Sequence, residues 1–296
     1  MFGVGTQVRR ILQWILGLDS LPATMGKAER ALRTLADRPA YAYLGNHRGL
    51  VVLRNECRIF VDTRDISVAP SLIAFGCWEP WVDAVVTRLT RSGAVAVDLG
   101  ANFGYFTLAL AKAAGPTGKV HAFEANSDVA SLLADTIVVN GLGDRVTLHN
   151  VAILDRRDTV ELRVDPRLLG GSYIAHPLEE RGLLRHAVDG MTLCDALPGI
   201  DRIDMLRMDI EGCEPLALMG AEPLIRQSPE LIIVSEWSVA MMAYHGREAR
   251  DLVDWLVGLG FRFWRISDDS VLEPVPPDDM LVLPHCDVVM ARQHLA

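Results

Sequence analysis

The sequence predicts an α/β fold with a mostly parallel sheet and helices on both faces of that sheet. Apolar runs typical of buried strands alternate with segments of helical character along most of the chain. One of these runs, Ala94–Val97, leads into Asp98 and two glycines four residues apart, Gly100 and Gly104. Near the C-terminus two strand-like runs follow each other without a long helix, which predicts that the last strand is antiparallel.

The N-terminal part is expected to form an extension of helices and a β-hairpin. Residues 1 to about 45 have the pattern of two helices, and residues 50–53 and 58–62 that of two strands joined by a turn. We therefore divide the chain into an extension, residues 1–90, and a domain, residues 91–296. The first helix has an apolar face formed by Val4, Val8, Ile11, Leu12, Ile15 and Leu16. This face predicts packing on the domain, or else a homodimer contact or a membrane-surface contact.

The turn after the first core strand has the composition of a nucleotide-type binding site. Gly100 permits a backbone conformation closed to other residues, and Gly104 permits close approach of the helix that follows. The dinucleotide fingerprint G-x-G-x-x-G is absent because Asn102 occupies the middle position. A ligand without a pyrophosphate, such as S-adenosylmethionine, does not need that glycine, and Asp98 is placed to receive its ammonium group.

The next elements place polar residues where such a ligand would lie. A helix over 105–114 leads to a second strand, 119–124, which ends in Glu124. An acidic residue at this point is placed to accept both ribose hydroxyls of an adenosine. A third strand, 145–151, ends at Asn150 and Ala152, where such folds line the adenine.

An insertion over 153–195 then interrupts the alternation, with a strand-like run at 160–164 and a turn at Gly170 and Gly171. The alternation resumes in the C-terminal third of the chain. Strands are expected at 203–210, 231–236, 261–266 and 287–291, with helices ending at 225 and spanning about 80–90 and 248–259. Together with the first three strands, this makes a sheet of seven.

Four blocks of this sequence resemble the FkbM family of methyltransferases: 98–104, 123–126, 150–152 and 203–214. The segments Gly76–Glu79 and Gly220–Ala221, together with Glu236, also match the family pattern. The departures are Ala125 in place of a usual proline and Arg207 in place of a usual lysine.

The resemblance implies a Rossmann-like class I methyltransferase fold and S-adenosylmethionine as the cofactor. It also implies transfer of a methyl group to a hydroxyl of a small metabolite, polyketide or glycan. The positions expected to bind the cofactor are Glu79, Asp98, Gly100, Asn102, Gly104, Glu124, Ala125, Asn150, Ala152 and Asp209.

An aliphatic hydroxyl is a poor nucleophile, so we expect a general base or a metal ion to assist the transfer. Polar residues that follow the fourth and fifth strands are the candidates. In one arrangement His245 takes the proton while Glu236 and Asp209 lie beside it. In the alternative, Asp209, Glu211 and Glu236 hold a divalent ion such as Mg²⁺. We favour the arrangement without a metal.

Composition narrows the remaining classes of function. The formal net charge of −9 argues against nucleic acid as a partner. The five cysteines form no C-x-x-C pair, which predicts a reduced, cytoplasmic setting. No apolar run is long enough to cross a bilayer, so no transmembrane segment is expected. The alternative functions are a non-catalytic scaffold that binds S-adenosylmethionine and an NAD-dependent oxidoreductase.

Overall fold

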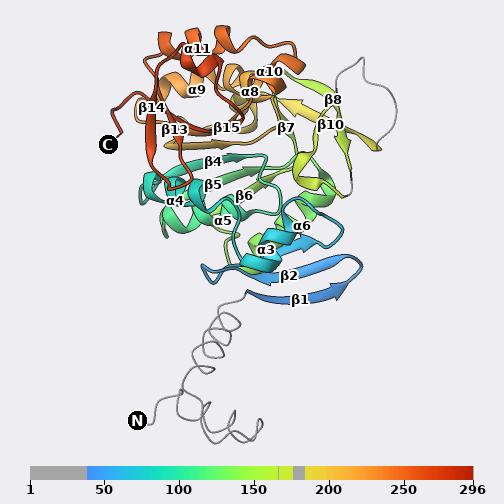
Figure 1. The fold of residues 1–296 in the computed structure, drawn as a ribbon. Coiled ribbons are helices and arrows are strands. Elements are labelled where there is room, and N and C mark those ends of the chain that lie inside the picture. Colours follow the sequence, from blue (N-terminus) through green and yellow to red (C-terminus); the bar gives the residue numbers. More distant parts are fainter. Residues whose placement is uncertain (1–38, 166, 176–183, 296) are drawn as a thin grey trace, which may run out of the picture. The chain divides into compact units, whose positions relative to one another are not determined.

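The computed structural model describes residues 39–165, 167–175 and 184–295, and its centre is a twisted sheet between two helical layers (Figure 1). Within this described part the sheet has eight strands, in the order β14-β13-β15-β12-β11-β4-β5-β6. The residues from Pro39 onward form one compact unit. The amphipathic helix expected over residues 4–16 lies outside the described residues. Its contacts, and the division of the chain at residue 90, stay predictions.

The five parallel strands of the sheet confirm the strands expected in the core of the chain. They pair in register, for example Val97 beside His121 and Leu206 beside Val97. Their bounds are β4 (Val95–Leu99), β5 (Lys119–Phe123), β6 (Val146–His149), β11 (Met205–Met208) and β12 (Ile232–Trp237). Because the strands are parallel, their carboxyl ends meet at one edge of the sheet, where ligands bind in open α/β folds.

The last strand is antiparallel, as expected, but it lies inside the sheet. Strand β15 (Cys286–Ala291) pairs with β12 on one side and with β13 (Arg262–Ile266) on the other. The outer edge is β14 (Leu272–Val275), an eighth strand that the sequence analysis did not include. The four apolar residues of 288–291 are buried, as in a strand covered on both faces. A short helical turn, η2 (Asp279–Leu281), precedes β15.

Alternate residues of the strands pack into two separate cores, one on each face of the sheet. Ala96 contributes to the core under the first group of helices, and Val97 to the core under the second group. The first group is α4 (Pro80–Leu89), α5 (Tyr105–Ala113) and α6 (Ser127–Val139). The second group is α8 (Glu214–Gly220), α9 (Glu222–Gln227), α10 (Val239–Tyr244) and α11 (Ala249–Gly258). The single helix expected up to residue 225 is thus two helices, and Pro223 stands in the first turn of α9.

A small antiparallel sheet precedes the core. The expected hairpin is present as β2 (Arg48–Val52) and β3 (Arg58–Asp62). The helix expected up to about residue 45 is wrong at its end, because Ala40–Gly45 forms a third strand, β1, paired with β2. The backbone amides of Arg58 and Phe60 donate hydrogen bonds to Asn140 and Thr136 at the end of α6. The sheet is therefore joined to the core, and helix α3 (Ala69–Phe75) leads on to α4.

The expected insertion forms a second small sheet that reaches over the carboxyl ends of the parallel strands. Its strand order is β7-β10-β8-β9. Its elements are β7 (Ala152–Ile153), β8 (Asp158–Val164), η1 (Leu169–Gly171), β9 (Tyr173–Ile174) and β10 (Leu184–Met191), followed by α7 (Leu193–Ala196). Among the described residues, no helix combines the length and the apolar character needed to cross a bilayer.

Candidate active site

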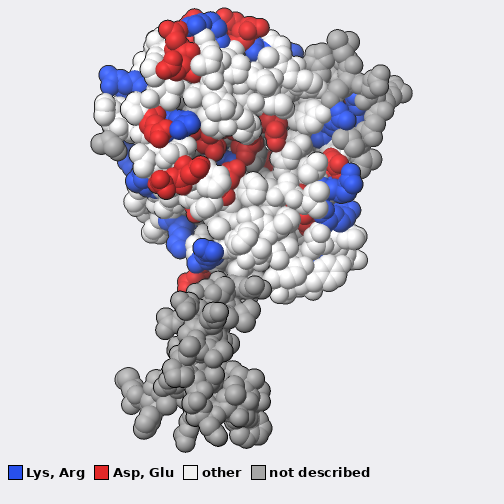
Figure 2. All heavy atoms as spheres, viewed as in Figure 1, with Lys and Arg blue, Asp and Glu red and all other residues white. Residues whose placement is uncertain are grey.

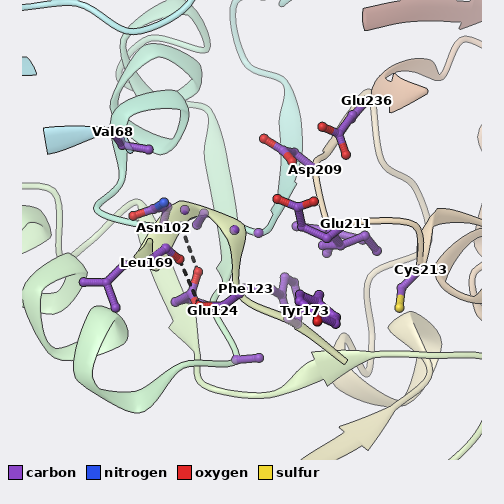
Figure 3. Close-up of a pocket in the computed structure, with 18 of the residues that line it drawn as sticks. Val68, Asn102, Phe123, Glu124, Leu169, Tyr173, Asp209, Glu211, Cys213 and Glu236 are labelled. Atoms are coloured by element: carbon purple, nitrogen blue, oxygen red, sulfur yellow. Dashed lines mark hydrogen bonds between the residues drawn. The ribbon is translucent and has the colours of Figure 1, made fainter. Parts of the chain in front are cut away.

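A pocket of about 440 Å³ lies at the carboxyl ends of β4, β5, β11 and β12. Segment 168–174 of the insertion and the residues Ser67 and Val68 before α3 also line it. In Figure 3 the carboxylates of Asp209, Glu211 and Glu236 lie at one end of this pocket, and Glu124 lies toward the other. Figure 2 shows acidic side chains gathered in a hollow of the face in view. The pocket therefore has two chemically distinct ends.

The turn after β4 has the conformation that its glycine was expected to permit. Gly100 has φ +75°, and a Cβ at this position would overlap the backbone oxygen of Asp209. The amides of Gly100 and Ala101 both donate to the Phe123 carbonyl, at 3.0 and 2.9 Å. The glycine thus allows the β4 turn to pack directly against the end of β11.

Glu124 is buried at the end of β5, and its carboxylate is held by the backbone at both oxygens. The amide of Asn102 donates to Oε2 at 2.9 Å, and the amide of Asn126 donates to Oε1 at 2.8 Å. Burial is the largest influence on this carboxyl and raises its pKa to about 7. Each oxygen of a carboxylate accepts more than one hydrogen bond, so Glu124 can still receive two donors from a ligand.

Most of the residues predicted to bind the cofactor line this pocket. They are Glu79, Gly100, Asn102, Glu124, Ala125, Ala152 and Asp209. They come from five separate places in the chain, and the parallel sheet brings them together.

Three of the predicted cofactor residues do not line the pocket. Asp98 is fully buried and accepts a hydrogen bond from Thr107 at 2.6 Å, and its contact with a ligand's ammonium group stays a prediction. A Cβ on Gly104 would press on Leu133 of α6, so this glycine serves helix packing. Asn150 is exposed, and its side-chain amide donates to the Glu124 carbonyl, which supports the loop beneath the pocket.

Arg207 is a buried cation that ties the floor of the pocket together. Its Nη2 donates to Asp209 Oδ2 at 2.7 Å, and its Nη1 donates to the Gly100 carbonyl at 3.2 Å. Nη1 also lies 3.6 Å from Asp98 Oδ1, and the guanidinium stacks on the Phe106 ring at 4.2 Å. The sequence analysis noted Arg207 only as a departure from the family pattern. Its planar group, with several donors, makes contacts that a lysine cannot all make.

The acidic end of the pocket holds more carboxylates than cations. Burial and neighbouring carboxylates raise the pKa of Glu79 to about 8, of Glu211 to about 7 and of Glu236 to about 10. The pKa of Asp287, on β15, is raised to about 6 for the same reasons. Such mutual repulsion is relieved by protons or by a cationic ligand.

Left-handed backbone conformations also gather at the pocket. Glu79 has φ 40°, Asn102 has φ 51° and Glu211 has φ 55°, and all three line the cavity. For a residue other than glycine, this backbone conformation costs about 1–2 kcal/mol of folding free energy. Strain of this kind persists where the surrounding structure imposes it, and it is concentrated at functional sites.

The histidine nearest to Glu236 is not the one that the sequence analysis selected. His245 is not among the residues that line the pocket, and its Nε2 lies 3.2 Å from the Glu211 backbone oxygen and 3.7 Å from Cys213 Sγ. His285 does line the pocket, and its Nε2 lies 3.0 Å from Glu236 Oε1. The pairing of β15 with β12, which the sequence alone does not show, brings His285 to this place.

The three carboxylates proposed for a metal ion, Asp209, Glu211 and Glu236, do line one pocket. Within the described residues, however, no group of three or more His, Cys, Asp or Glu side chains is arranged to hold a metal. Two of the three already have a cationic or imidazole partner, since Asp209 contacts Arg207 and Glu236 contacts His285.

The raised pKa of Glu236 predicts a pH-dependent stability. A carboxyl whose pKa rises from about 4.5 to about 10 on folding stabilises the fold below pH 4.5, and this stabilisation is lost as the pH rises toward 10. We therefore expect Glu236→Gln, without ligand, to raise the free energy of unfolding at pH 8 by about 1–3 kcal/mol and to change it little at pH 4.5. Urea denaturation at both pH values measures this.

A matched control is Glu273→Gln, which alters an exposed carboxylate paired with Arg265. An equal effect of Glu236→Gln at both pH values would contradict the assignment of a raised pKa to this side chain.

The fold and the pocket define the class of protein. A parallel sheet with an antiparallel strand beside β12, and a ligand pocket over its carboxyl ends, is the architecture of a Rossmann-like methyltransferase. The family model described as "Methyltransferase FkbM domain" matches residues 98–263. The chain belongs to this family of FkbM methyltransferase domains, which makes S-adenosylmethionine the expected methyl donor, in agreement with the sequence analysis.

Several solved structures resemble the chain at low sequence identity. Methyltransferase FkbM from Methylobacillus flagellatus KT is 15% identical, with a TM-score of 0.42, over 70% of this chain and 50% of that one. An O-methyltransferase from Bacillus cereus, solved in complex with SAH, is 12% identical over 96% of both chains, with a TM-score of 0.42. Precorrin-6y C5,15-methyltransferase from Geobacter metallireducens GS-15 is 16% identical over 72% and 87%, with a TM-score of 0.39.

The chain thus spans half the length of the Methylobacillus protein. No curated protein matches the chain.

Proposed function

We propose that this chain transfers a methyl group from S-adenosylmethionine to a hydroxyl of a small metabolite, polyketide or glycan. The observation that supports this most is that one pocket joins a diol-accepting carboxylate, Glu124, to an acidic end rich in proton acceptors. The cofactor supplies the methyl group on a sulfonium, whose positive charge suits the carboxylates at that end.

The residues of the pocket fit the parts of such a cofactor. The geometry of Glu124 supports a role in binding the ribose hydroxyls, because backbone donors hold both its oxygens in one orientation. Ala125 and Ala152 offer small apolar surfaces on the side of β5 and β6, which suit an adenine. Asp209, whose side chain is 29% exposed, is available to a cationic group despite its contact with Arg207. The pocket volume of about 440 Å³ lies in the ordinary range for a ligand site.

The role of Glu124 predicts a loss of cofactor binding when its carboxylate is removed. We expect Glu124→Ala to weaken binding of S-adenosylmethionine by about 1.5–3 kcal/mol, which is roughly a tenfold to hundredfold change. Isothermal titration calorimetry measures this, and Glu230→Gln, which alters an exposed carboxylate beside Arg91, is a matched control. Unchanged binding by Glu124→Ala would show that the ribose lies elsewhere.

Methyl transfer itself is tested by following a labelled methyl group. A thermal shift with S-adenosylmethionine, S-adenosylhomocysteine and NAD first asks which of them stabilises the native state. The protein is then incubated with labelled S-adenosylmethionine and a metabolite extract, and the labelled product is identified by its mass. Stabilisation by NAD alone, or binding without any labelled product from the extract, would contradict the proposal.

A further inference from the structure

The two carboxylate oxygens of Glu236 have different surroundings. Oε1 lies 3.0 Å from Nε2 of His285. Oε2 is buried and has no hydrogen-bond partner among the described residues. A buried polar atom without a partner costs free energy, and such atoms in native structures commonly mark a place where a ligand or water binds. Oε2 therefore has lone pairs that no group of the described residues uses.

The pair also reaches from the interior to the solvent. The side chain of Glu236 is 13% exposed, whereas that of His285 is 64% exposed, and both line the pocket. Their closeness follows from the sheet, because Glu236 on β12 pairs with Asp287 on β15 and His285 stands two residues before Asp287. In Figure 3 the Glu236 carboxylate lies with those of Asp209 and Glu211, at the acidic end.

We propose that Glu236 takes the proton of the acceptor hydroxyl at Oε2 and that His285 passes this proton to the solvent. This inference rests on the proposed methyl transfer and goes beyond it, because it assigns the proton acceptor and its exit. Glu236 then has the role that the sequence analysis gave to His245, and His285 has a role that the sequence did not predict.

The step balances in atoms and in charge. The O–H bond of the acceptor breaks, its proton goes to Oε2, and the electron pair left on oxygen forms the new bond to the methyl carbon. The electrons of the broken C–S bond stay on sulfur. The negative charge of Glu236 and the positive charge of the sulfonium therefore disappear together, so no unpaired charge is left in a poorly solvated pocket. The carboxyl of Glu236 then turns its protonated oxygen to Nε2 of His285, which takes the proton, and His285 releases another proton from Nδ1.

The charges that face Glu236 favour this direction of transfer. Burial has the largest effect on its pKa, and neighbouring carboxylates in the β11–α8 loop, on α8 and on β15 raise it further. These neighbours are Asp209, Glu211, Glu214 and Asp287, and His285 is the facing imidazole. A bound sulfonium offsets them and keeps Glu236 ionised before the transfer, and the charge of the next sulfonium to bind favours release of the proton through His285.

Asp209 and His245, the other predicted catalytic residues, are less suited to the step. Asp209 Oδ2 already accepts a charge-assisted hydrogen bond from Arg207 at 2.7 Å. His245 Nε2 lies beside the Glu211 carbonyl and Cys213 Sγ, outside the lining of the pocket. Only Glu236 joins a buried, unpartnered oxygen to an exposed imidazole within the described part of the pocket lining.

The test compares Glu236→Gln and His285→Ala with the parent chain in the labelled-extract assay. His294→Gln, an exposed histidine outside the pocket lining, is the control. We expect Glu236→Gln to slow formation of the labelled product by about 10²-fold or more, and His285→Ala by about tenfold. Titration with S-adenosylhomocysteine should show binding within about threefold of the parent, because neither substitution touches the ribose end.

Added imidazole separates proton transfer from a structural effect. A carrier in solution can replace an exposed side chain, so imidazole should restore much of the rate of His285→Ala and none of the rate of Glu236→Gln. Rates equal to the parent in Glu236→Gln, or a loss in His285→Ala that imidazole does not restore, would overturn this inference alone. A parent chain that makes no labelled product would overturn the proposed function, and this inference with it.

Discussion

Replacing Arg207 by methionine is expected to lower the free energy of unfolding by about 3–5 kcal/mol, because it leaves a buried carboxylate without its cation. Asp98 is fully buried, and Arg207 is the charged group beside it, 3.6 Å from Oδ1. Burial raises the pKa of Asp98 and Arg207 lowers it, so removal of the guanidinium leaves the effect of burial opposed by the hydrogen bond from Thr107 alone. Denaturation with urea at pH 7 measures the loss.

A second substitution shows whether buried charge is the cause. Asp98→Asn in the Arg207→Met background removes the unpaired carboxylate, and we expect it to recover at least about 1 kcal/mol of the loss. Arg207→Lys keeps the positive charge but loses the planar guanidinium that reaches both Asp209 and the Gly100 carbonyl. Its free energy of unfolding should therefore lie between that of the parent and that of Arg207→Met. If the double variant is as unstable as the sum of its single variants, lost packing on Phe106, not lost charge, explains the effect.

Much of the site was predictable because local sequence determines it. The apolar run before Asp98 is a strand, Gly100 has the positive φ that its place in a tight turn implied, and Glu124 ends the second core strand. In a parallel sheet the strand ends must meet at one edge, so the separate segments that line the pocket follow from their order in the chain.

The role of Asp98 was not predictable because it depends on a neighbour 109 residues away. An acidic residue near the end of a core strand is typical of a ligand-binding carboxylate, and the sequence analysis read it so. In the structure Asp98 pairs in register with Arg207 of β11 and accepts a hydrogen bond from Thr107 of α5. Only the pairing of β4 with β11 shows that the charge of Asp98 faces Arg207 inside the protein.

The position of His285 beside Glu236 was not predictable for a related reason. His245 follows β12 closely in the sequence, so it was predicted to lie beside Glu236. The strand that pairs with β12 on its outer side is β15, which comes about fifty residues later and directly follows His285. The uninterrupted apolar run at 288–291 is the one signal that indicated an interior position for this strand.

The second large effect is expected from Gly100→Ala, because a Cβ there meets backbone and not a movable side chain. The new atom would overlap the Asp209 carbonyl, and the residue would have to keep φ +75°. The conformation costs about 1–2 kcal/mol, and displacement of a packed backbone costs about 1–3 kcal/mol more. Since Gly100 and Asp209 both line the pocket, binding of S-adenosylhomocysteine should also fall by more than about tenfold.

Substitutions at two other glycines distinguish the cost of the positive φ from the cost of the overlap with backbone. Gly141 has φ +65° with nothing within 4 Å of a Cβ, so Gly141→Ala should show the cost of conformation alone, about 1–2 kcal/mol, with normal ligand binding. Gly143 has open space and no positive φ, so Gly143→Ala should be close to neutral. Urea denaturation and calorimetry on all three variants make the comparison. We expect Gly100→Ala to lose more stability than Gly141→Ala. We also expect it to be the only one of the three variants that binds S-adenosylhomocysteine more weakly than the parent. If it does neither, the β4 turn does not depend on its contact with Asp209, and the cofactor lies away from this turn.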